Sequence, residues 1–345
     1  MKTDILSLTE SQLKSKITEL GEKPYRAAQV FAWLHRNHAL DFGEMTSLPK
    51  GLRDRLGEVF CIRPVKIIKK IESLLDSTKK YLFETDNSNI IEGVLMKYES
   101  GNSVCVSSQA GCRMGCRFCA SGLNGLERNL SAGEMLSQVY TIAGDIGESV
   151  SNVVIMGCGE PLDNYGELVR FLEIINSPGG LNMSHRRITV STCGLADKIR
   201  ELVGLRLQIT LAVSLHAPND GIRRRIMPAA AKYPLKELLA ACGEYAEKTG
   251  RRVTYEYAMI AGLNDDMAHA RELAGLLEGS LCHVNLIPVN NVLERGFVKS
   301  GAEAIDRFAE ILAGKGITVT KRREMGADID AACGQLRNRL TVNRE

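Results

Sequence analysis

The chain has 345 residues and a formal net charge of only +3, which excludes a strongly basic protein that binds nucleic acid through its overall field. Hydrophobic residues make up 44% and charged residues 25%, as in globular proteins, and no uncharged run approaches the roughly 20 residues of a membrane span. The first residues contain no apolar signal core, so we expect a cytoplasmic protein. In that location, ten cysteines favour metal-binding or catalytic thiols over disulfides.

The first hundred residues predict a small helical unit followed by a few strands. Thr9 to Gln12 can form a capping box, and residues 25–37 form an amphipathic helix around Trp33. After Pro64, three β-like runs follow. We therefore predict an N-terminal helical accessory domain at 1–60 and a small β linker region at 61–100, which would serve in substrate docking.

From about residue 103, β-rich runs alternate with helical periodicity. Strands are predicted at 103–109, 152–157, 186–192, 207–215, 251–260, 282–290 and 316–324. Helices are predicted at 131–147, 165–176, 195–203, 234–249, 265–278 and 301–314. Six strand–helix units are too few for a closed eight-stranded barrel, so we predict an α/β fold with an open, partial (β/α)6 barrel over 101–345. Functional residues should lie at the carboxyl ends of its strands.

The stretch GCRMGCRFCASG, residues 111–122, places three cysteines, Cys112, Cys116 and Cys119, within eight positions. A structural zinc site needs four ligands, and no second Cys or His pair stands nearby. Iron–sulfur clusters tolerate a position without a cysteine. C-x3-C-x2-C with Phe118 before the last cysteine resembles the signature of radical S-adenosylmethionine (SAM) enzymes. That resemblance implies a radical-SAM barrel with one [4Fe-4S] cluster, whose fourth iron chelates SAM.

Several strand ends carry small or polar residues that could bind this cofactor. In GCGEP, Gly159 would let the backbone approach a ligand closely, and Glu160 could receive the ammonium of SAM. A lone His216 is usually structural, and Cys158 is expected to pack. Because several strand ends bear such groups, coincidence is a poor explanation. The remaining cofactor-binding candidates are Ser191, Ser214, Leu215, His216 and Asn290.

Two further cysteines, Cys105 and Cys333, acquire meaning only from a family resemblance, since each alone would be read as a small buried hydrophobic residue. The chain resembles the dual-specificity ribosomal-RNA and transfer-RNA adenine-C2 methyltransferases of the radical-SAM class. The resemblance runs from about residue 21 to 336. The matching pieces are GEKPYRAAQVFAWL, CVSSQAGCRMGCRFCASG, MGCGEPLDN, ITVSTCG, SLHAPND, HVNLIPVN and DIDAACGQL.

The resemblance implies a covalent mechanism. One SAM methylates Cys333, and a second is cleaved to an adenosyl radical that takes hydrogen from the S-methyl group. The carbon radical adds to carbon 2 of the adenine and forms a protein–RNA adduct. Glu92 matches the proton acceptor of the family. Cys105 then attacks Cys333, which gives a transient disulfide and releases methylated RNA.

Three alternatives and several partners remain at this stage. The related carbon-8 methyltransferases that confer antibiotic resistance share the cysteine features, although GEP and LIPVN favour carbon 2. A non-catalytic, metal-stabilised RNA-binding protein would need a fourth protein ligand, and a radical enzyme acting on another substrate would leave DIDAACGQL unexplained.

The partners implied are 23S rRNA and tRNA, with an electron donor such as flavodoxin and its reductase. We expect no membrane association and a monomer.

Charge clustering adds little to this expectation of an RNA substrate. The basic clusters are Arg186–Arg187, Arg223–Arg225, Arg251–Arg252 and Lys321–Arg323. Such clusters are more often solvated faces than phosphate contacts, so taken alone they indicate an RNA footprint only weakly.

Overall fold

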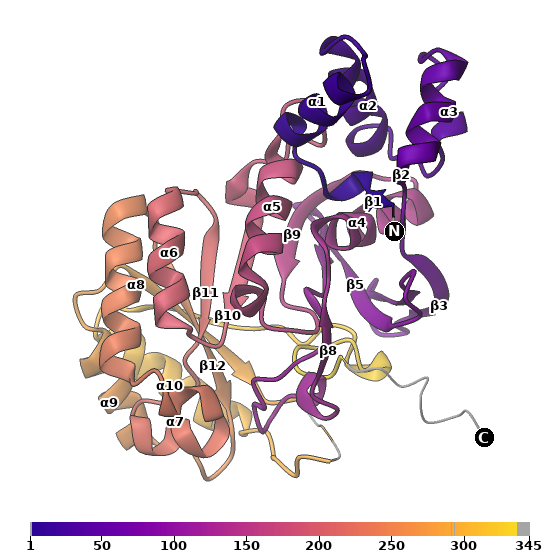
Figure 1. Cartoon of the computed structure of the whole chain (residues 1–345). Coiled ribbons are helices and arrows are strands. Elements are labelled where there is room, and N and C mark those ends of the chain that lie inside the picture. Colours follow the sequence, from indigo (N-terminus) through magenta and orange to yellow (C-terminus); the bar gives the residue numbers. More distant parts are fainter. Residues whose placement is uncertain (1, 291, 293, 337–345) are drawn as a thin grey trace.

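The structure, a computed structural model, describes residues 2–290, 292 and 294–336. Within these residues the largest sheet has ten strands in the order β14-β13-β12-β11-β10-β9-β6-β5-β4-β3 (Figure 1). Its parallel strands run in chain order: β6 (Gly101–Cys105), β9 (Val150–Ile155), β10 (Ile188–Thr192), β11 (Thr210–Ser214), β12 (Val253–Met259), β13 (Cys282–Pro288) and β14 (Thr318–Lys321). The predicted α/β class with an open, partial barrel of six strand–helix units is confirmed.

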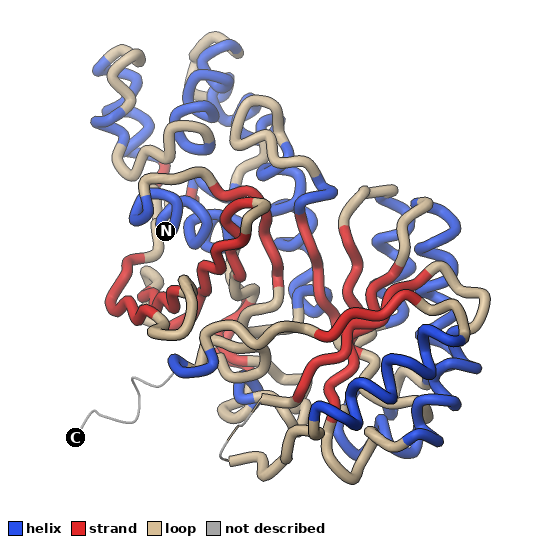
Figure 2. The backbone as a smooth tube through the Cα atoms, turned by 180° about the vertical axis from the view of Figure 1, so that it is seen from behind, coloured by secondary structure: helices blue, strands red, loops and turns tan. Residues whose placement is uncertain are grey.

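Helices connect successive parallel strands and cover the outer side of the curved sheet, which Figure 2 shows from behind. They are α4 (Ala132–Ile146), α5 (Tyr165–Asn176), α6 (Ala196–Leu205), α7 (Asp220–Ile226), α8 (Leu235–Thr249), α9 (Met267–Leu277) and α10 (Ala302–Gly314). All but the short α7 were predicted. The strands bury apolar residues such as Val153, Val190 and Val213, while Ser191, Ser214 and Glu256 line the cavity at their carboxyl ends. The S-x-x-E pattern from Ser131 to Glu134 predicts a capping box at the start of α4, and these two residues form it.

The N-terminal unit contains α1 (Glu10–Glu19), α2 (Tyr25–His35) and α3 (Lys50–Val59), with a parallel pair formed by β1 (Thr3–Asp4) and β2 (Phe60–Cys61). The capping box at Thr9 and Gln12 is confirmed. The predicted amphipathic helix at 25–37 is confirmed as α2, whose buried face includes Phe31 and Leu34, and Trp33 is half-buried against the core. Tyr140 on α4 hydrogen-bonds His35 at 3.0 Å and fixes this unit to the barrel.

The three β-like runs after Pro64 form β3 (Lys66–Glu72), β4 (Lys79–Glu84) and β5 (Ile90–Tyr98). They pair antiparallel, and β5 continues the main sheet by pairing with β6. The predicted linker strands are thus hydrogen-bonded to the barrel sheet. No described helix combines the length and apolar composition that a membrane crossing requires. The last residues of the predicted third domain, 337–345, lie outside the described part of the chain.

Candidate active site

A cavity opens at the carboxyl ends of the parallel strands, where the barrel fold predicts functional residues. Its empty volume, with the open mouth included, is about 1020 Å³. Leu215 does not line it: its side chain is fully buried, and its backbone N–H donates to the Glu256 carbonyl at 3.0 Å. The predicted residues that do line it are Cys112, Cys116, Cys119, Gly159, Glu160, Ser191, Ser214, His216, Asn290 and Cys333.

The three predicted metal-binding cysteines share one wall of this cavity. Their loop begins in the hairpin of β7 (Gln109–Gly111) and β8 (Leu126–Asn129), where the Cys112 N–H donates to the Gly125 carbonyl at 2.8 Å. Burial raises the pKa of Cys112 to about 12 and also raises the pKa of Cys116; neighbouring thiols add to both shifts. When these thiols are ionised they repel one another, so a positively charged metal centre is needed to stabilise the thiolate forms.

The donor set fits a polynuclear iron centre better than one metal ion. Among residues 2–290, 292 and 294–336, no three His, Cys, Asp or Glu side chains lie close enough together to hold a single ion. Three thiols that line one cavity without converging on a single ion suit a cluster, whose irons are bound by separate cysteines. The chain's own residues therefore fit a [4Fe-4S] cluster held by three ligands.

Glu160 and the neighbouring Gly159 lie in a tightly packed turn after β9. The Glu160 carboxylate, 3% exposed, accepts hydrogen bonds from the Leu162 and Cys193 N–H groups at 3.0 and 2.7 Å. Burial raises its pKa and these hydrogen bonds oppose the rise, so the site favours a cationic partner such as an ammonium. Gly159 has φ +110°, and a Cβ there would lie 2.6 Å from the Gln109 Cβ.

His216 presents a neutral ring to the cavity. Its Nδ1 accepts a hydrogen bond from the Ala258 N–H at 2.9 Å, so the ring proton resides on Nε2. Burial, with the charge of Arg223, lowers the pKa of His216 to about 3. The ring packs edge-on against Phe118 at 4.7 Å between centroids. His216 is therefore a fixed hydrogen-bond donor for a ligand over the physiological pH range.

Arg223, on α7, is a functional candidate that sequence reasoning missed. It is fully buried, and its guanidinium donates to the carbonyls of Cys193 at 2.8 Å, Tyr233 at 3.0 Å and Leu215 at 3.2 Å. It thereby connects the segments that follow β10 and β11. The sequence placed it in an Arg223–Arg225 cluster that looks solvated, and only Arg224 and Arg225 are exposed.

The loop that carries Cys333 is bound to the cysteine loop. The Ala120 N–H donates to the Gly334 carbonyl at 2.7 Å, and the Ser121 hydroxyl donates to the Leu336 carbonyl at 2.9 Å. Asn290, at the end of the sixth strand, donates to the Cys333 carbonyl at 2.8 Å. These contacts fix a distant C-terminal segment at the mouth of the barrel.

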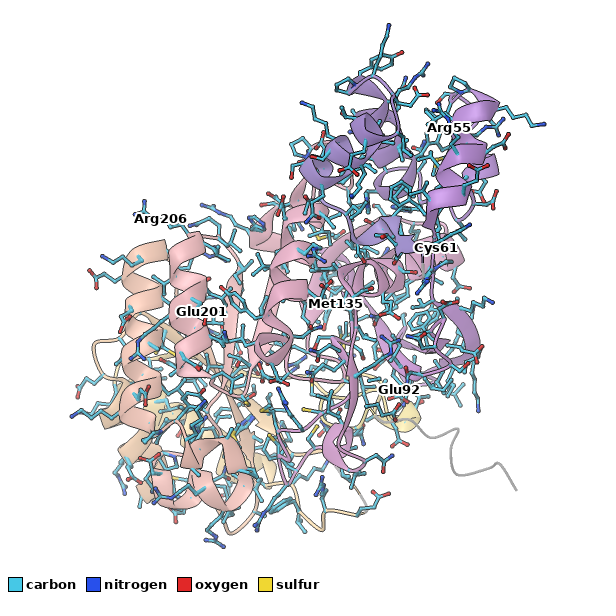
Figure 3. The ribbon with its side chains drawn as sticks, viewed as in Figure 1. Arg55, Cys61, Glu92, Met135, Glu201 and Arg206 are labelled. Atoms are coloured by element: carbon cyan, nitrogen blue, oxygen red, sulfur yellow. The ribbon has the colours of Figure 1, made fainter. Side chains whose placement is uncertain are left out.

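Cys105 and Glu92 lie beside the cavity rather than in its wall. Cys105, on β6, packs with Met156 and Ala331, and burial followed by the nearby Cys333 raises its pKa to about 12. Glu92, labelled in Figure 3, points from β5 into a smaller cavity that Cys158 also lines. Cys105 and Cys333 are both free thiols in the structure.

An acid–base pair, the buried Glu256 and the partly buried Arg322, completes the cavity wall and was also missed. Arg322 Nη1 lies 3.8 Å from Glu256 Oε2, which accepts a hydrogen bond from the Asn285 amide at 2.8 Å. Cys333 and Glu256 raise the pKa of Arg322 against the effect of burial. A charged residue inside the apolar run of β12 was the available signal for Glu256. Arg322 was hidden in the Lys321–Arg323 cluster, whose other members are exposed.

Two family models match the chain. Residues 3–62 match the model described as ribosomal RNA large subunit methyltransferase N-terminal domain, and residues 106–274 match the radical SAM superfamily. A solved structure, described as a radical SAM methyltransferase from Sphaerobacter thermophilus, is similar with a TM-score of 0.93 and 46% identity. The match covers 97% of this chain and 99% of that one.

Curated relatives match along nearly the whole chain. A protein of Alkaliphilus oremlandii (strain OhILAs), described as a probable dual-specificity RNA methyltransferase RlmN, is 54% identical over 99% of both chains. A protein of Lachnospira eligens with the same description is 52% identical over 98% of this chain and 96% of its own. Sequence, fold and cysteine geometry agree, and the chain belongs to the RlmN family of radical SAM methyltransferases.

Proposed function

We propose that this protein methylates carbon 2 of a specific adenosine in 23S rRNA and in tRNA. One observation carries the proposal: the hydrogen bond from Ala120 to Gly334 joins the loop of Cys333 to the loop of the three clustered cysteines. A thiol that could carry one carbon thereby lines the same cavity as the thiols that would hold the cluster. The close similarity to RlmN proteins supports an RNA substrate.

The residues of the cavity divide into two binding roles. Cys112, Cys116 and Cys119 would hold one [4Fe-4S] cluster. A reduced cluster with bound SAM supplies a 5′-deoxyadenosyl radical, which suits carbon 2 of adenine because that electron-poor carbon cannot attack a methyl group itself. The barrel excludes water from this chemistry. The residues that would orient SAM are Gly159, Glu160, Ser191, Ser214, His216 and Asn290, with the backbone of Leu215.

Three residues would carry the covalent steps. Cys333 accepts a methyl group on sulfur and later delivers that carbon to the adenine. Glu92 accepts the proton that the adduct loses. The Cys105 thiolate attacks the sulfur of Cys333, so a disulfide forms as the bond from Cys333 to the transferred carbon breaks. That carbon keeps the electron pair of the broken bond and takes up a proton, which gives the methyl group of the released RNA. The one electron that the radical adduct loses before this step would return to the cluster. Cys105 and Ala331, which lies two residues before Cys333, belong to one hydrophobic cluster, and this supports the pairing.

An anaerobic assay with labelled SAM, a low-potential reductant and protein-free 23S rRNA or tRNA, followed by nucleoside analysis, tests this function. We expect 2-methyladenosine from both RNAs. Recovery of 8-methyladenosine would establish the carbon-8 alternative instead. Binding of RNA without any methylated product, by protein that contains its full complement of iron and sulfide, would favour the non-catalytic alternative.

The proposed activity also defines the partners and the location. Reduction of the cluster requires an electron donor such as flavodoxin with its reductase. Ribosomal and transfer RNA are found in the cytoplasm, where we place the protein, and we propose that it acts as a monomer. The exposed Arg224 and Arg225, beside the cavity on α7, are candidates for phosphate contacts.

A further inference from the structure

Lys80 is a buried lysine that contacts both Glu92 and the loop of Cys333. Its side chain is only 4% exposed, and its Nζ lies 2.9 Å from Glu92 Oε1, whose side chain is 2% exposed. The same Nζ donates to the main-chain carbonyl of Asp330 at 3.1 Å, three residues before Cys333. A lysine rarely occupies such a position without a partner, because burying its charge is costly.

The strand register explains why these groups meet. In the antiparallel pair of β4 and β5, Lys80 is opposite Val94 and Leu82 is opposite Glu92. Lys80 and Glu92 are therefore diagonal neighbours on one face of the sheet. The C-terminal segment packs over this face, since Ala331 and Leu336 share a hydrophobic cluster with Val94 and Met96.

The loop of Cys333 has other anchors on the β3–β4 connection. The Gly326 N–H donates to Asp76 at 3.0 Å, and Asp328 accepts hydrogen bonds from the Ser73 hydroxyl at 2.8 Å and the Leu74 N–H at 2.9 Å. These contacts hold the start of the loop without Lys80. The particular contribution of Lys80 is that it joins the loop to Glu92.

We propose that Lys80 is a positioning residue: its ammonium keeps Glu92 ionised and holds this carboxylate beside the loop that carries Cys333. The inference rests on the proposed function, in which Glu92 accepts a proton from the RNA adduct. The other titratable side chains that line the cavity at Glu92 are Glu127 from β8 and Cys158 after β9. Both are neutral or anionic, so Lys80 supplies the positive charge of this set. Without it, we expect burial to favour the protonated form of this carboxylate, which cannot accept a proton.

The test compares Lys80→Met with Lys79→Met in otherwise wild-type protein. Lys79, the preceding residue on β4, is 25% exposed and pairs with Glu72 at the surface, so its loss should leave turnover unchanged. Single-turnover reactions are quenched and run on denaturing gels with labelled RNA to follow the adduct. For Lys80→Met we expect normal methylation of Cys333 and a normal adduct yield. The adduct should decay more slowly, by about tenfold for each pH unit by which the ionisation of Glu92 shifts upward. Decay should recover as pH rises.

A merely structural role predicts a different pattern. Loss of thermal stability or iron content with an unchanged pH profile of adduct decay would overturn the inference, as would decay at the wild-type rate. If Lys80→Met does not fold, Lys80→Gln and Lys80→Arg replace it. We expect slow, pH-dependent decay in the neutral variant and near wild-type decay in the charged one, and equal rates would contradict the proposal. Failure of the proposed function itself is distinguishable, because then no adduct forms even with Lys80 present.

Discussion

Cys105 and Cys333 lie close enough together that a charge on Cys333 raises the pKa of Cys105, although one is on the first parallel strand and the other is near the C-terminus. Their surroundings differ. Cys105 is buried in an apolar cluster with Ala331, whereas Cys333 is half-exposed and lines the cavity. The two thiols are thus adjacent but chemically unequal.

This inequality predicts an order of alkylation. At pH 8, iodoacetamide should modify Cys333 at least about tenfold faster than Cys105, because a buried thiol with a pKa of about 12 is almost entirely protonated and shielded. Tandem mass spectrometry of digested samples gives both rates in one experiment. Cys242, also buried with its pKa raised to about 12, is the matched slow control. Faster modification of Cys105 than of Cys333 would contradict the structure.

Cluster binding should depend on the cysteine loop alone. Cys116→Ala is expected to lose most of the iron and sulfide after anaerobic reconstitution, because two thiolates are too few to hold a cluster. Cys242→Ala, which removes a buried thiol on α8 away from the cavity, should retain them. Iron and sulfide analysis measures both variants. A full cluster in Cys116→Ala would show that the ligands lie elsewhere.

Stability should fall on mild acidification because of buried neutral histidines. His35 is fully buried against Tyr140 with its pKa lowered to about 3, chiefly by burial. A lowered histidine pKa gives stability that is complete above the unfolded pKa of 6.5 and is lost as pH falls toward 3. Going from pH 7.5 to 5 should therefore cost roughly 2 kcal/mol through His35.

The contribution of His35 is measured by difference. Asp4, whose pKa burial raises to about 6, acts in the opposite direction over part of this range, so wild-type data alone are ambiguous. Chemical denaturation of wild type and His35→Phe at both pH values isolates the histidine. The variant should lose roughly 2 kcal/mol less on acidification. Equal losses would show that His35 is not held neutral.

Gly159 should not tolerate a side chain. Its φ of +110° and the short approach to Gln109 mean that Gly159→Ala strains the backbone and displaces β7, at a cost of roughly 2–4 kcal/mol. Gly144→Ala on α4 meets no atom within 4 Å and should be neutral or stabilising by up to about 1 kcal/mol. Thermal unfolding compares the two variants. Equal stability of both would mean that the turn after β9 is less tightly packed than described.

The sequence predicted the barrel well because its signals are local. Apolar runs bounded by turns located each parallel strand, and the capping boxes at Thr9 and Ser131 located two helix starts. The seven-residue α7 is too short to show periodicity, and the β7–β8 hairpin is interrupted by the cysteine loop. The pairing of β5 with β6 joins the linker strands to the barrel through tertiary contacts that no local pattern reports.

The residues of the candidate site also fall into those that a local pattern identifies and those that only the fold identifies. Cys112, Cys116, Cys119 and the strand-end residues could be named because they occur in short motifs, whereas Cys105 and Cys333 were identified by resemblance. Lys80, Arg223 and Arg322 could not, since each belongs to a run of basic residues in which only the fold decides which member is withdrawn from solvent, fully for Lys80 and Arg223 and partly for Arg322. Glu92 was identified by resemblance alone, and its partner Lys80 became apparent only from the strand register.

The most direct test of the covalent account uses Cys105→Ala with labelled RNA under turnover conditions. Without the resolving thiol, a covalent protein–RNA adduct should accumulate, and mass spectrometry should locate its link at Cys333. Cys333→Ala should bind its cluster and form neither adduct nor methylated RNA. Normal methylation by Cys333→Ala, or the absence of any adduct in active Cys105→Ala, would contradict the account.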